Sequence, residues 1–447
     1  MTLLTGWGRT AASGATVRRP RSVDELRALV AAAGDRGVIA RGLGRSYGDA
    51  AQDAGGEVLD CTALAGSRCI DAATGLVTAS AGLSLETLMR DLLAVGWFVP
   101  VTAGTRHVTV GGALASDIHG KNHHVDGSFG RHVVRFTLVT ADGEVRTVTP
   151  DGDPELFWAT VGGMGLTGVV VDVTFRATPA ETAFMRVDTQ RARDLEHALD
   201  LMTTTDEDYR YTVAWIDLLA TGASMGRSVL TRGDHARLAD LPARRRTDPL
   251  AFDPRVRLAA PPWAPSGMLN RLTVRAFNEM WFRKAPTDRR DEIQPITTFF
   301  HPLDIISGWN RLYGPHGFVQ YQFVVPFGAE PTLRRVVERL SGNGVASFLA
   351  VLKRFGPGNP GLLSFPMPGW TLALDIPATV RHLGELLGEL DQLVADAGGR
   401  IYLAKDSVAT PEMLRRMYDR LPEWHAVRDK VDPERRMMSD LARRLEL

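Results

Sequence analysis

Three glycine-dense segments occupy residues 41–49, 104–120 and 161–168, and each adjoins a short apolar run typical of a β-strand. Glycine allows backbone N–H groups to approach an anion and allows turns at positive φ. One such loop alone is usually a simple tight turn, whereas three together favour a phosphate-binding cradle. None has the G-x-G-x-x-G spacing between a strand and a helix, and no G-x-x-x-x-G-K-[ST] loop occurs. The sequence therefore indicates a dinucleotide site that is neither a Rossmann site nor a P-loop.

Chain length and charge narrow the class of protein further. A chain of 447 residues is expected to form two domains. Lys+Arg and Asp+Glu are balanced at 52 each, which argues against a protein whose main role is to coat nucleic acid. Cys61 and Cys69 lack metal-ligand spacing and are read as ordinary thiols. No run approaches the roughly 18 apolar residues of a membrane span, and no secretion signal is visible.

Periodicity predicts a mixture of helices and strands. Ser22 and Glu25 form a capping-box pattern that predicts a helix over residues 22–37, and Ser84 predicts the start of a second helix over 84–95. Further elements are expected along the rest of the chain: strands at 38–40, 169–175, 209–217, 318–325 and 370–376, and helices at 331–340 and 380–397. Residues 232–295 show weak periodicity, and no element is assigned to them.

The glycine loops carry a family resemblance. Residues 41–49 resemble the first pyrophosphate loop of the vanillyl-alcohol-oxidase (PCMH-type) flavoproteins, and residues 104–113 are similar to their second. Other runs resemble the branch of that family that oxidises decaprenylphosphoryl-ribose: 117–124, 157–163, 165–168, 301–304, 320–323, 364–366 and 404–407. The resemblance implies a two-domain α+β fold. It places an FAD-binding domain at 1–183, an inserted antiparallel-sheet substrate domain at 184–399, and a C-terminal segment at 400–447 that returns to the FAD domain.

FAD is the cofactor that the resemblance implies, and we expect it to be held non-covalently. Many relatives carry a histidine that bonds to the flavin where Arg45 stands, and arginine cannot form that bond. The family match assigns cofactor contacts to residues of the loops and their surroundings: Arg41, Gly42, Leu43, Gly44, Arg45, Ser46, Tyr47, Gly104, Thr105, Thr109, Gly112, Ala113, Asp117, His119, Gly120, Asn122, Gly165, Val170 and Tyr402.

His119 and Lys405 are the candidate catalytic residues. Oxidation of an alcohol with FAD requires a hydride acceptor and a group that takes the hydroxyl proton. A neutral histidine is available at pH 7, and a lysine in an apolar stretch can have a depressed pKa or can support negative charge on a reduced flavin. By themselves these residues are better explained by a structural histidine and by a surface ion pair between Lys405 and Asp406. The resemblance favours the catalytic roles.

Polar residues within apolar strands suggest the sugar pocket. Gln320 and Gln322 share one face of a strand because side chains alternate, and burial of such groups favours a polar ligand. A solvent-facing strand explains the same pattern equally well. The resemblance selects the pocket and implies these substrate contacts: Tyr47, Lys121, Trp215, Gln320, Gln322, Lys353, Phe355, Asp375 and Lys405. Ala373 stands where some branch members have a cysteine that nitroaromatic inhibitors modify.

His119, Lys121, His123 and His124 form a cluster that lacks helix-spaced metal ligands with an acidic partner, so we expect no metal site. A phosphate-facing or flavin-facing role is favoured, although Lys121 is also explained as a solvated lysine. We expect residues 232–295 and 304–318 to form flexible flaps over the site.

The resemblance implies oxidation of the ribose 2-hydroxyl of a polyprenyl-phosphoryl ribose to the 2-keto sugar, the first half of epimerisation to the arabinose donor. A separate NAD(P)H-dependent keto-reductase is the expected partner. The lipid substrate implies that the protein acts at the surface of the inner membrane without spanning it, and it leaves the choice between the cytoplasmic and the periplasmic face undecided. An aldonolactone or alditol oxidase is the alternative within the superfamily, and Arg45 counts against it. A non-catalytic flavin- or lipid-binding partner protein is the second alternative, against which His119 and Lys405 argue.

Overall fold

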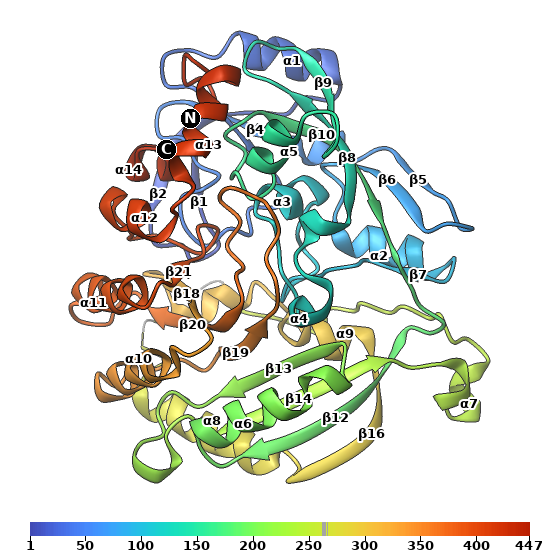
Figure 1. Cartoon of the computed structure of the whole chain (residues 1–447), viewed down its shortest axis with the longest axis vertical. Helices are drawn as coiled ribbons and strands as arrows, with labels where there is room; N and C mark the ends of the chain where they lie inside the picture. Colours follow the sequence, from blue (N-terminus) through green and yellow to red (C-terminus); the bar gives the residue numbers. More distant parts are fainter. Residues whose placement is uncertain (262–264, 266) are drawn as a thin grey trace.

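Two small sheets form the amino-terminal part of the chain in the computed structural model, which describes residues 1–261, 265 and 267–447 (Figure 1). The first sheet has the order β1-β2-β4-β3, and the second has the order β5-β6-β10-β8-β9. Their strands have these bounds: β1 Thr2–Thr5, β2 Ala12–Arg18, β3 Val38–Arg41, β4 Glu57–Asp60, β5 Arg68–Ile70, β6 Leu76–Ser80, β8 Val133–Val139, β9 Val145–Val148 and β10 Val169–Arg176. The first glycine loop begins where β3 ends, and the third glycine loop ends where β10 begins. Both positions confirm the strands that were predicted beside these loops.

Side-chain caps set the starts of the two predicted amino-terminal helices. Ser22 Oγ accepts the N–H of Glu25 at the start of α1 (Val23–Ala31), and Ser84 Oγ accepts the N–H of Thr87 at the start of α2 (Leu85–Leu93). Both starts agree with the sequence. However, α1 ends at Ala31 rather than at residue 37, because Gly34 and Gly37 follow and Gly37 has a φ of +83°.

An eight-stranded antiparallel sheet forms the middle of the chain, with the order β16-β12-β14-β13-β19-β20-β18-β21. It occupies the lower part of Figure 1, while the two small sheets lie above it. Its strands have these bounds: β12 Phe184–Ala192, β13 Tyr211–Ile216, β14 Ser228–His235, β16 Asp288–Pro295, β18 Phe318–Pro326, β19 Ala350–Phe355, β20 Gly369–Pro377 and β21 Arg400–Ile401. The predicted strands at 209–217, 318–325 and 370–376 are thereby confirmed, as is the α+β class.

Helices cover the sheets and close the fold. The predicted helices at 331–340 and 380–397 are present as α10 and α11. The remaining α-helices and two-stranded pairs have these bounds: α3 Val110–Ala115, α4 His123–Asp126, α5 Pro154–Thr160, α6 Leu195–Thr205, α7 Ala243–Arg246, α8 Arg271–Lys284, α9 Ile296–Phe300, α10 Glu330–Gly342, α11 Leu383–Asp396, α12 Pro411–Met417, α13 Leu421–Val431, α14 Asp440–Leu445, β7 Trp97–Phe98 with β11 Thr178–Pro179, and β15 Leu258–Ala259 with β17 Ile306–Ser307.

The carboxyl-terminal segment returns to the first small sheet. Met437 bridges Val38 of β3, and the Arg443 guanidinium pairs with buried Asp53. The N and C termini accordingly lie side by side at the top of Figure 1. We retain as a proposal the division into an FAD domain at 1–183, a substrate domain at 184–399 and a returning segment at 400–447.

The segment 232–295, to which the sequence assigned no element, contains regular structure. Residues 271–284 form α8, the 14-residue helix capped by Asn270, and residues 288–295 form the edge strand β16. Part of the proposed flap, residues 262–264 and 266, lies outside the described residues. Residues 302–313 form short turns of 3₁₀-helix around β17. The mobility that was expected of both flaps stays a prediction.

Candidate active site

One cavity of about 1120 Å³ brings the three glycine loops together with one face of the large sheet. Ligand pockets usually enclose about 300–1,000 Å³, so this space can hold a ligand larger than a typical small molecule. Most of the expected cofactor residues line it: Arg41, Gly42, Leu43, Gly44, Arg45, Ser46, Tyr47, Gly104, Thr105, Thr109, Gly112, His119, Gly120, Gly165, Val170 and Tyr402.

The floor of the cavity is built from bare backbone, as a dinucleotide cradle requires. A Cβ atom on Gly42 would lie 2.2 Å from Thr109 Oγ1, so the first and second loops touch. A Cβ atom on Gly111 would lie 2.9 Å from the Cβ of Ala81. Thr109 itself accepts the N–H of Gly112 and fixes the turn. Side chains on these glycines would push the neighbouring segments apart, and their close approach fits an FAD pyrophosphate held by backbone groups.

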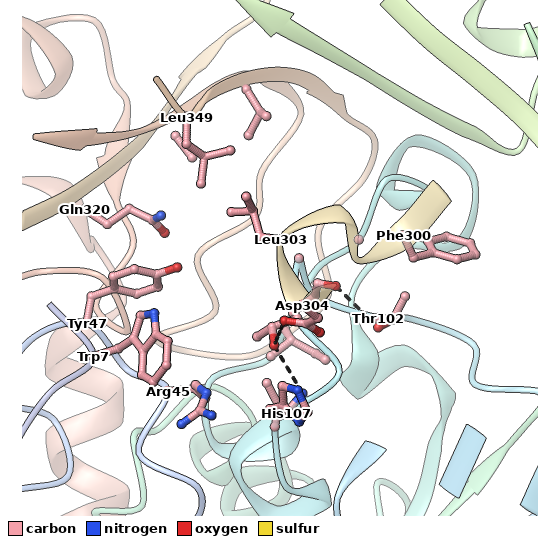
Figure 2. Close-up of a pocket in the computed structure, with 18 of the residues that line it drawn as sticks. Trp7, Arg45, Tyr47, Thr102, His107, Phe300, Leu303, Asp304, Gln320 and Leu349 are labelled. Carbon is pink, nitrogen blue, oxygen red and sulfur yellow. Dashed lines mark hydrogen bonds between the residues drawn. The ribbon is translucent and has the colours of Figure 1, made fainter. Parts of the chain in front are cut away.

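Two arginines stiffen the first loop. Arg41 donates to the carbonyl oxygens of Ala51 and Thr5, both at 2.8 Å. Arg45 donates to the carbonyl oxygen of Leu43 at 2.7 Å, and its guanidinium carbon lies 4.0 Å from the centre of the Trp7 ring. In Figure 2, Arg45 and Trp7 lie beside Tyr47 at one side of the cavity.

His119 is enclosed at the junction of the loops and the large sheet. Its ring packs 4.7 Å from that of Phe355, centre to centre, and its two nitrogens lie 3.1 Å from Lys353 Nζ and 3.1 Å from Gln322 Nε2. Burial, reinforced by the positive charges of Lys353 and Lys405, lowers the pKa of His119 well below its ordinary value. His119 is therefore neutral at pH 7.

The hydrogen-bond network around His119 assigns its tautomer. Thr371 Oγ1 donates to the carbonyl oxygen of Phe323, so it accepts from Gln322 Nε2. The second hydrogen of that amide then points at His119 Nε2, which must accept. The ring proton consequently sits on Nδ1 and is donated to Lys353 Nζ, which is possible only if that amine is uncharged. Burial lowers the pKa of Lys353 to about 7, so the uncharged amine makes up about half of the population at pH 7.

Lys405 reaches the same cavity from the chain that follows β21. Its ammonium nitrogen lies 5.2 Å from the centre of the Tyr47 ring and makes no hydrogen bond with any side chain that the structure describes. Burial lowers its pKa to about 8, and the nearby carboxylate of Asp375 opposes that shift. Asp375 is held by Gln320 and by Tyr313, whose hydroxyl donates at 3.1 Å. Lys405 is therefore an amine poised between its two protonation states.

A third buried amine completes the site. Lys121 Nζ donates to the carbonyl oxygen of Phe299 and lies 4.3 Å from the centre of the Phe299 ring. Burial lowers the pKa of Lys121 to about 7. Lys121, Lys353 and Lys405 all line the cavity, and within the described ranges none of them is paired with a carboxylate at ion-pair distance. A bound anion would raise the pKa values of these amines and draw protons to them.

The expected substrate residues come mainly from one face of the large sheet. Gln320 and Gln322 both line the cavity, and Trp215 lies on the same face with its indole N–H donating to the carbonyl oxygen of Phe348. Tyr47, Lys121, Lys353 and Lys405 also line it. Ala373, on the neighbouring strand, is paired with Gln322 and contributes a methyl group to the wall.

Five residues expected at the site lie outside the lining of the cavity: Ala113, Asp117, Asn122, Phe355 and Asp375. The Asp117 carboxylate is occupied by Ser128, Ser364, Asn359 and the N–H of Gly130. Asn122 donates to the carbonyl oxygen of Pro100 and to Asp126, while Ala113 packs in the core. Phe355 lies behind His119, and Asp375 behind Gln320. The structure gives these side chains supporting positions rather than positions facing a ligand.

Sequence reasoning noted residues 301–304 for their resemblance and placed Asp304 in a flap, but it did not predict that residues 302–304 form a wall of the cavity. The Asp304 carboxylate accepts from Thr105 Oγ1 at 2.8 Å and from the N–H of Arg106 at 2.9 Å. His301 Nε2 lies 2.9 Å from Thr102 Oγ1. Figure 2 shows Leu303 and Asp304 facing Tyr47 and Gln320 across the cavity. The His–Pro–Leu–Asp run had been noted for its resemblance, but a contact with the second loop some 199 positions away has no local signal.

The remaining histidines of the 117–124 run point away from one another. His123 is buried against the Phe355 ring at 4.4 Å, and His124 Nε2 lies 2.9 Å from the carbonyl oxygen of Tyr209. Among the residues that the structure describes, no group of three His, Cys, Asp or Glu side chains is arranged to hold a metal ion.

Comparisons with known proteins agree with this geometry. A family of FAD binding domains matches residues 15–149, and the D-arabinono-1,4-lactone oxidase family matches residues 378–445. Decaprenylphosphoryl-beta-D-ribose oxidase of Mycolicibacterium smegmatis is 47% identical over 99% of the chain and 97% of its own length. An uncharacterised protein of Streptomyces coelicolor is 42% identical over 82% of the chain. L-gulono-1,4-lactone dehydrogenase of Mycobacterium tuberculosis is 24% identical over 98% of the chain.

The glycine cradle, the matching FAD domain and the sheet-lined cavity define an FAD-dependent oxidoreductase of the vanillyl-alcohol-oxidase (PCMH) type. The cradle fits FAD, as expected from the sequence. Within that class the chain belongs to the decaprenylphosphoryl-β-D-ribose oxidase family, because the similarity to that enzyme extends over almost all of both chains.

Proposed function

We propose that this enzyme oxidises the 2-hydroxyl of the ribose in decaprenylphosphoryl-β-D-ribose to the 2-keto sugar. The observation that carries the proposal is the set of three buried amines, Lys121, Lys353 and Lys405, at one cavity, where no carboxylate of the described residues lies at ion-pair distance from them. Such a site favours a ligand that is both polar and anionic, as a phosphoryl sugar is. The similarity to the mycobacterial oxidase supports the same substrate class.

In this proposal Lys405 takes the hydroxyl proton. A general base works best when its pKa lies near the working pH, and the pKa of Lys405 is lowered to about 8. Bound FAD would supply the hydride acceptor, held non-covalently by the three loops. Gln320 fixes Asp375 in place, and the carboxylate keeps the Lys405 amine from losing its proton too readily.

His119 positions the sugar in the same proposal. Its Nδ1 proton is committed to Lys353, and Gln322 occupies Nε2. A histidine with both nitrogens engaged and a depressed pKa is a poor proton acceptor. It holds the Lys353 amine at a defined place, where that amine can donate to a hydroxyl or phosphate oxygen of the substrate.

Two partners follow from the same substrate. A separate NAD(P)H-dependent keto-reductase would reduce the 2-keto product to the arabinose epimer. The lipid tail would bring the enzyme to the surface of the inner membrane, at either face. In the described part of the chain, no helix is long and apolar enough to cross a membrane.

A lactone oxidase activity is the alternative, since the C-terminal residues 378–445 match that family. Anaerobic mixing with decaprenylphosphoryl ribose, and separately with an aldonolactone, distinguishes the two. We expect bleaching of the flavin absorbance with the phosphoryl sugar alone, and slow bleaching in His119→Ala and Lys405→Met. Lys430→Met, which alters an exposed lysine paired with Glu155, is the matched control. Bleaching by the lactone alone, or none with either compound, contradicts the proposal.

A further inference from the structure

The cavity extends beyond the amines along the open face of the large sheet. Strand register sets Ala373 beside Val351, Val351 beside Trp215, and Trp215 beside Val229, which forms a row across β20, β19, β13 and β14. All four side chains line the cavity. The next strand of the sheet after β14 is β12. Neighbouring strands are about 4.8 Å apart, so the four steps from β20 to β12 span about 19 Å.

A second row lies beside the first. Val213 of β13 pairs with Thr231 of β14, and Thr231 pairs with Thr189 of β12. These three side chains also line the cavity. No side chain in either row is charged, and charged groups return only at the rim, where Lys284, Arg289 and Glu292 line the opening.

Helix α8 lies over these two rows. Phe277 and Trp281, one helical turn apart, both line the cavity, and their rings are stacked with centres 6.1 Å apart. Phe277 also meets the Phe348 ring edge-on at 6.0 Å. The sheet and α8 thus enclose an apolar channel, defined by Val213, Val229, Thr231, Phe277 and Trp281, which we call the α8 channel.

The α8 channel is not ordinary core. Val213, Trp215 and Val351 lie in the middle of central strands, yet each keeps part of its surface accessible, because each of them lines the cavity. Three apolar side chains of α8 are exposed among its exposed basic residues Arg271, Arg275, Arg283 and Lys284: Leu272 is 77% exposed, Met280 56% and Trp281 42%. Exposed apolar groups at the mouth of an apolar channel suit a ligand that arrives from lipid.

We propose that the α8 channel binds a run of the substrate's polyprenyl chain beyond its first two isoprene units. The inference rests on the proposed function, since it assigns the tail of the substrate whose phosphoryl ribose lies at the three amines. A single ligand with a polar anionic head and a long, narrow apolar tail matches both halves of the cavity. The rest of the chain would leave past Trp281 and stay in the membrane, so that the enzyme need not extract the whole lipid.

Thr231→Trp tests the channel by filling it. The substrates are decaprenylphosphoryl ribose and a two-isoprene analogue, both in detergent micelles. For wild-type enzyme we expect kcat/KM to be higher with the long chain. Filling the channel should lower kcat/KM for the long chain by about ten-fold or more and leave the short analogue within about two-fold. Thr231→Ser is the matched control and should change neither value.

Flavin content and melting temperature show whether Thr231→Trp has folded, and Val213→Phe fills the same channel from the adjacent strand if it has not. An equal loss for both substrates in a folded, flavin-loaded variant overturns the proposal, as does an unchanged preference for the long chain.

Decaprenyl phosphate, which has no ribose to oxidise, separates this inference from the proposed function. It should raise the melting temperature of the wild-type holoenzyme more than a two-isoprene phosphate does, and Thr231→Trp should remove that difference. This result would support the channel even if the ribose were not oxidised. Equal stabilisation of wild type by both phosphates overturns the channel even if the ribose is oxidised.

Discussion

The protonation of Lys405 makes a quantitative prediction about the pH dependence of flavin reduction. If the uncharged amine accepts the substrate proton, the rate must rise as pH increases through the pKa of Lys405. That pKa is lowered to about 8, so about one tenth of the amine is free at pH 7 and about nine tenths at pH 9. The rate constant for flavin reduction should therefore rise about ten-fold between these two pH values. If Lys121 or Lys353 were the base, the rise would be centred about one unit lower, because their pKa values are lowered to about 7.

The assay is anaerobic stopped-flow measurement of flavin absorbance at saturating substrate from pH 6 to 10. Lys405→Met should lower the rate constant by about a hundred-fold or more and abolish the inflection near pH 8. Asp375→Asn should move the inflection of an otherwise active enzyme to lower pH, because the carboxylate raises the pKa of Lys405. An unchanged inflection in Lys405→Met would refute the assignment of the base.

Three further predictions follow from single residues. Acid precipitation should release the FAD into the supernatant, because Arg45 offers no covalent link to the flavin; flavin in the pellet would contradict this. Lys353→Met should stabilise the folded protein by up to about 4 kcal/mol at pH 7, measured by thermal melting, because the pKa of Lys353 is lowered from 10.5 to about 7. Between pH 7 and pH 10.5 the unfolded chain binds more protons than the folded protein, so the stability of the wild type should rise with pH over this range, and the stability of the variant should rise less. A variant that melts at a lower temperature than the wild type would contradict the prediction that the buried amine destabilises the folded protein. Ala373→Cys in a Cys61→Ala, Cys69→Ser background should be alkylated by iodoacetamide, with protection by substrate, whereas the background protein, which has no cysteine, should stay unmodified in intact-mass analysis.

Local signals predicted much of the fold. The Ser22 and Ser84 caps begin helices, as the sequence indicated, since a capping side chain and its N–H lie within three residues of each other. Strands β13, β18 and β20 were also recognisable. Most of their apolar residues are buried in the middle of one sheet, so the composition of each segment is typical of a buried strand.

Helix α8 escaped detection for a physical reason. Only Val274 and Asn278 are buried along it, and one of these is polar, while Leu272, Met280 and Trp281 are exposed. The usual apolar stripe is therefore absent. Strand β16 was missed because it is an edge strand whose first four residues, Asp288 to Asp291, are all charged and exposed. Charged edges prevent aggregation but remove the alternation by which a strand is recognised.

The family motifs in the sequence did not show which way the side chains of their residues point. Asp117 belongs to the same run as His119, yet its carboxylate is taken up by Ser364 and Asn359, which lie 247 and 242 positions away. The partner of His119 is Lys353, 234 positions away, on a strand whose register the sequence does not specify. Contacts at such separations depend on how the loops dock on the sheet. Residue identity alone could therefore suggest candidate residues but could not show which way their side chains point.

The two ends of the cavity differ because they use different strands of one sheet. Strands β18 and β20 lie under the glycine loops and carry Gln320, Gln322 and Asp375, while β13 and β14 lie under α8 and carry Val213 and Val229. A ligand that spans both ends is held with its head beside the flavin and its tail toward the mouth. If the channel holds the polyprenyl chain, the 2-keto product keeps the same tail and must leave through the same mouth. The keto sugar would then emerge at the membrane surface on which the exposed face of α8 rests, and a reductase that takes it up must be able to work at that surface.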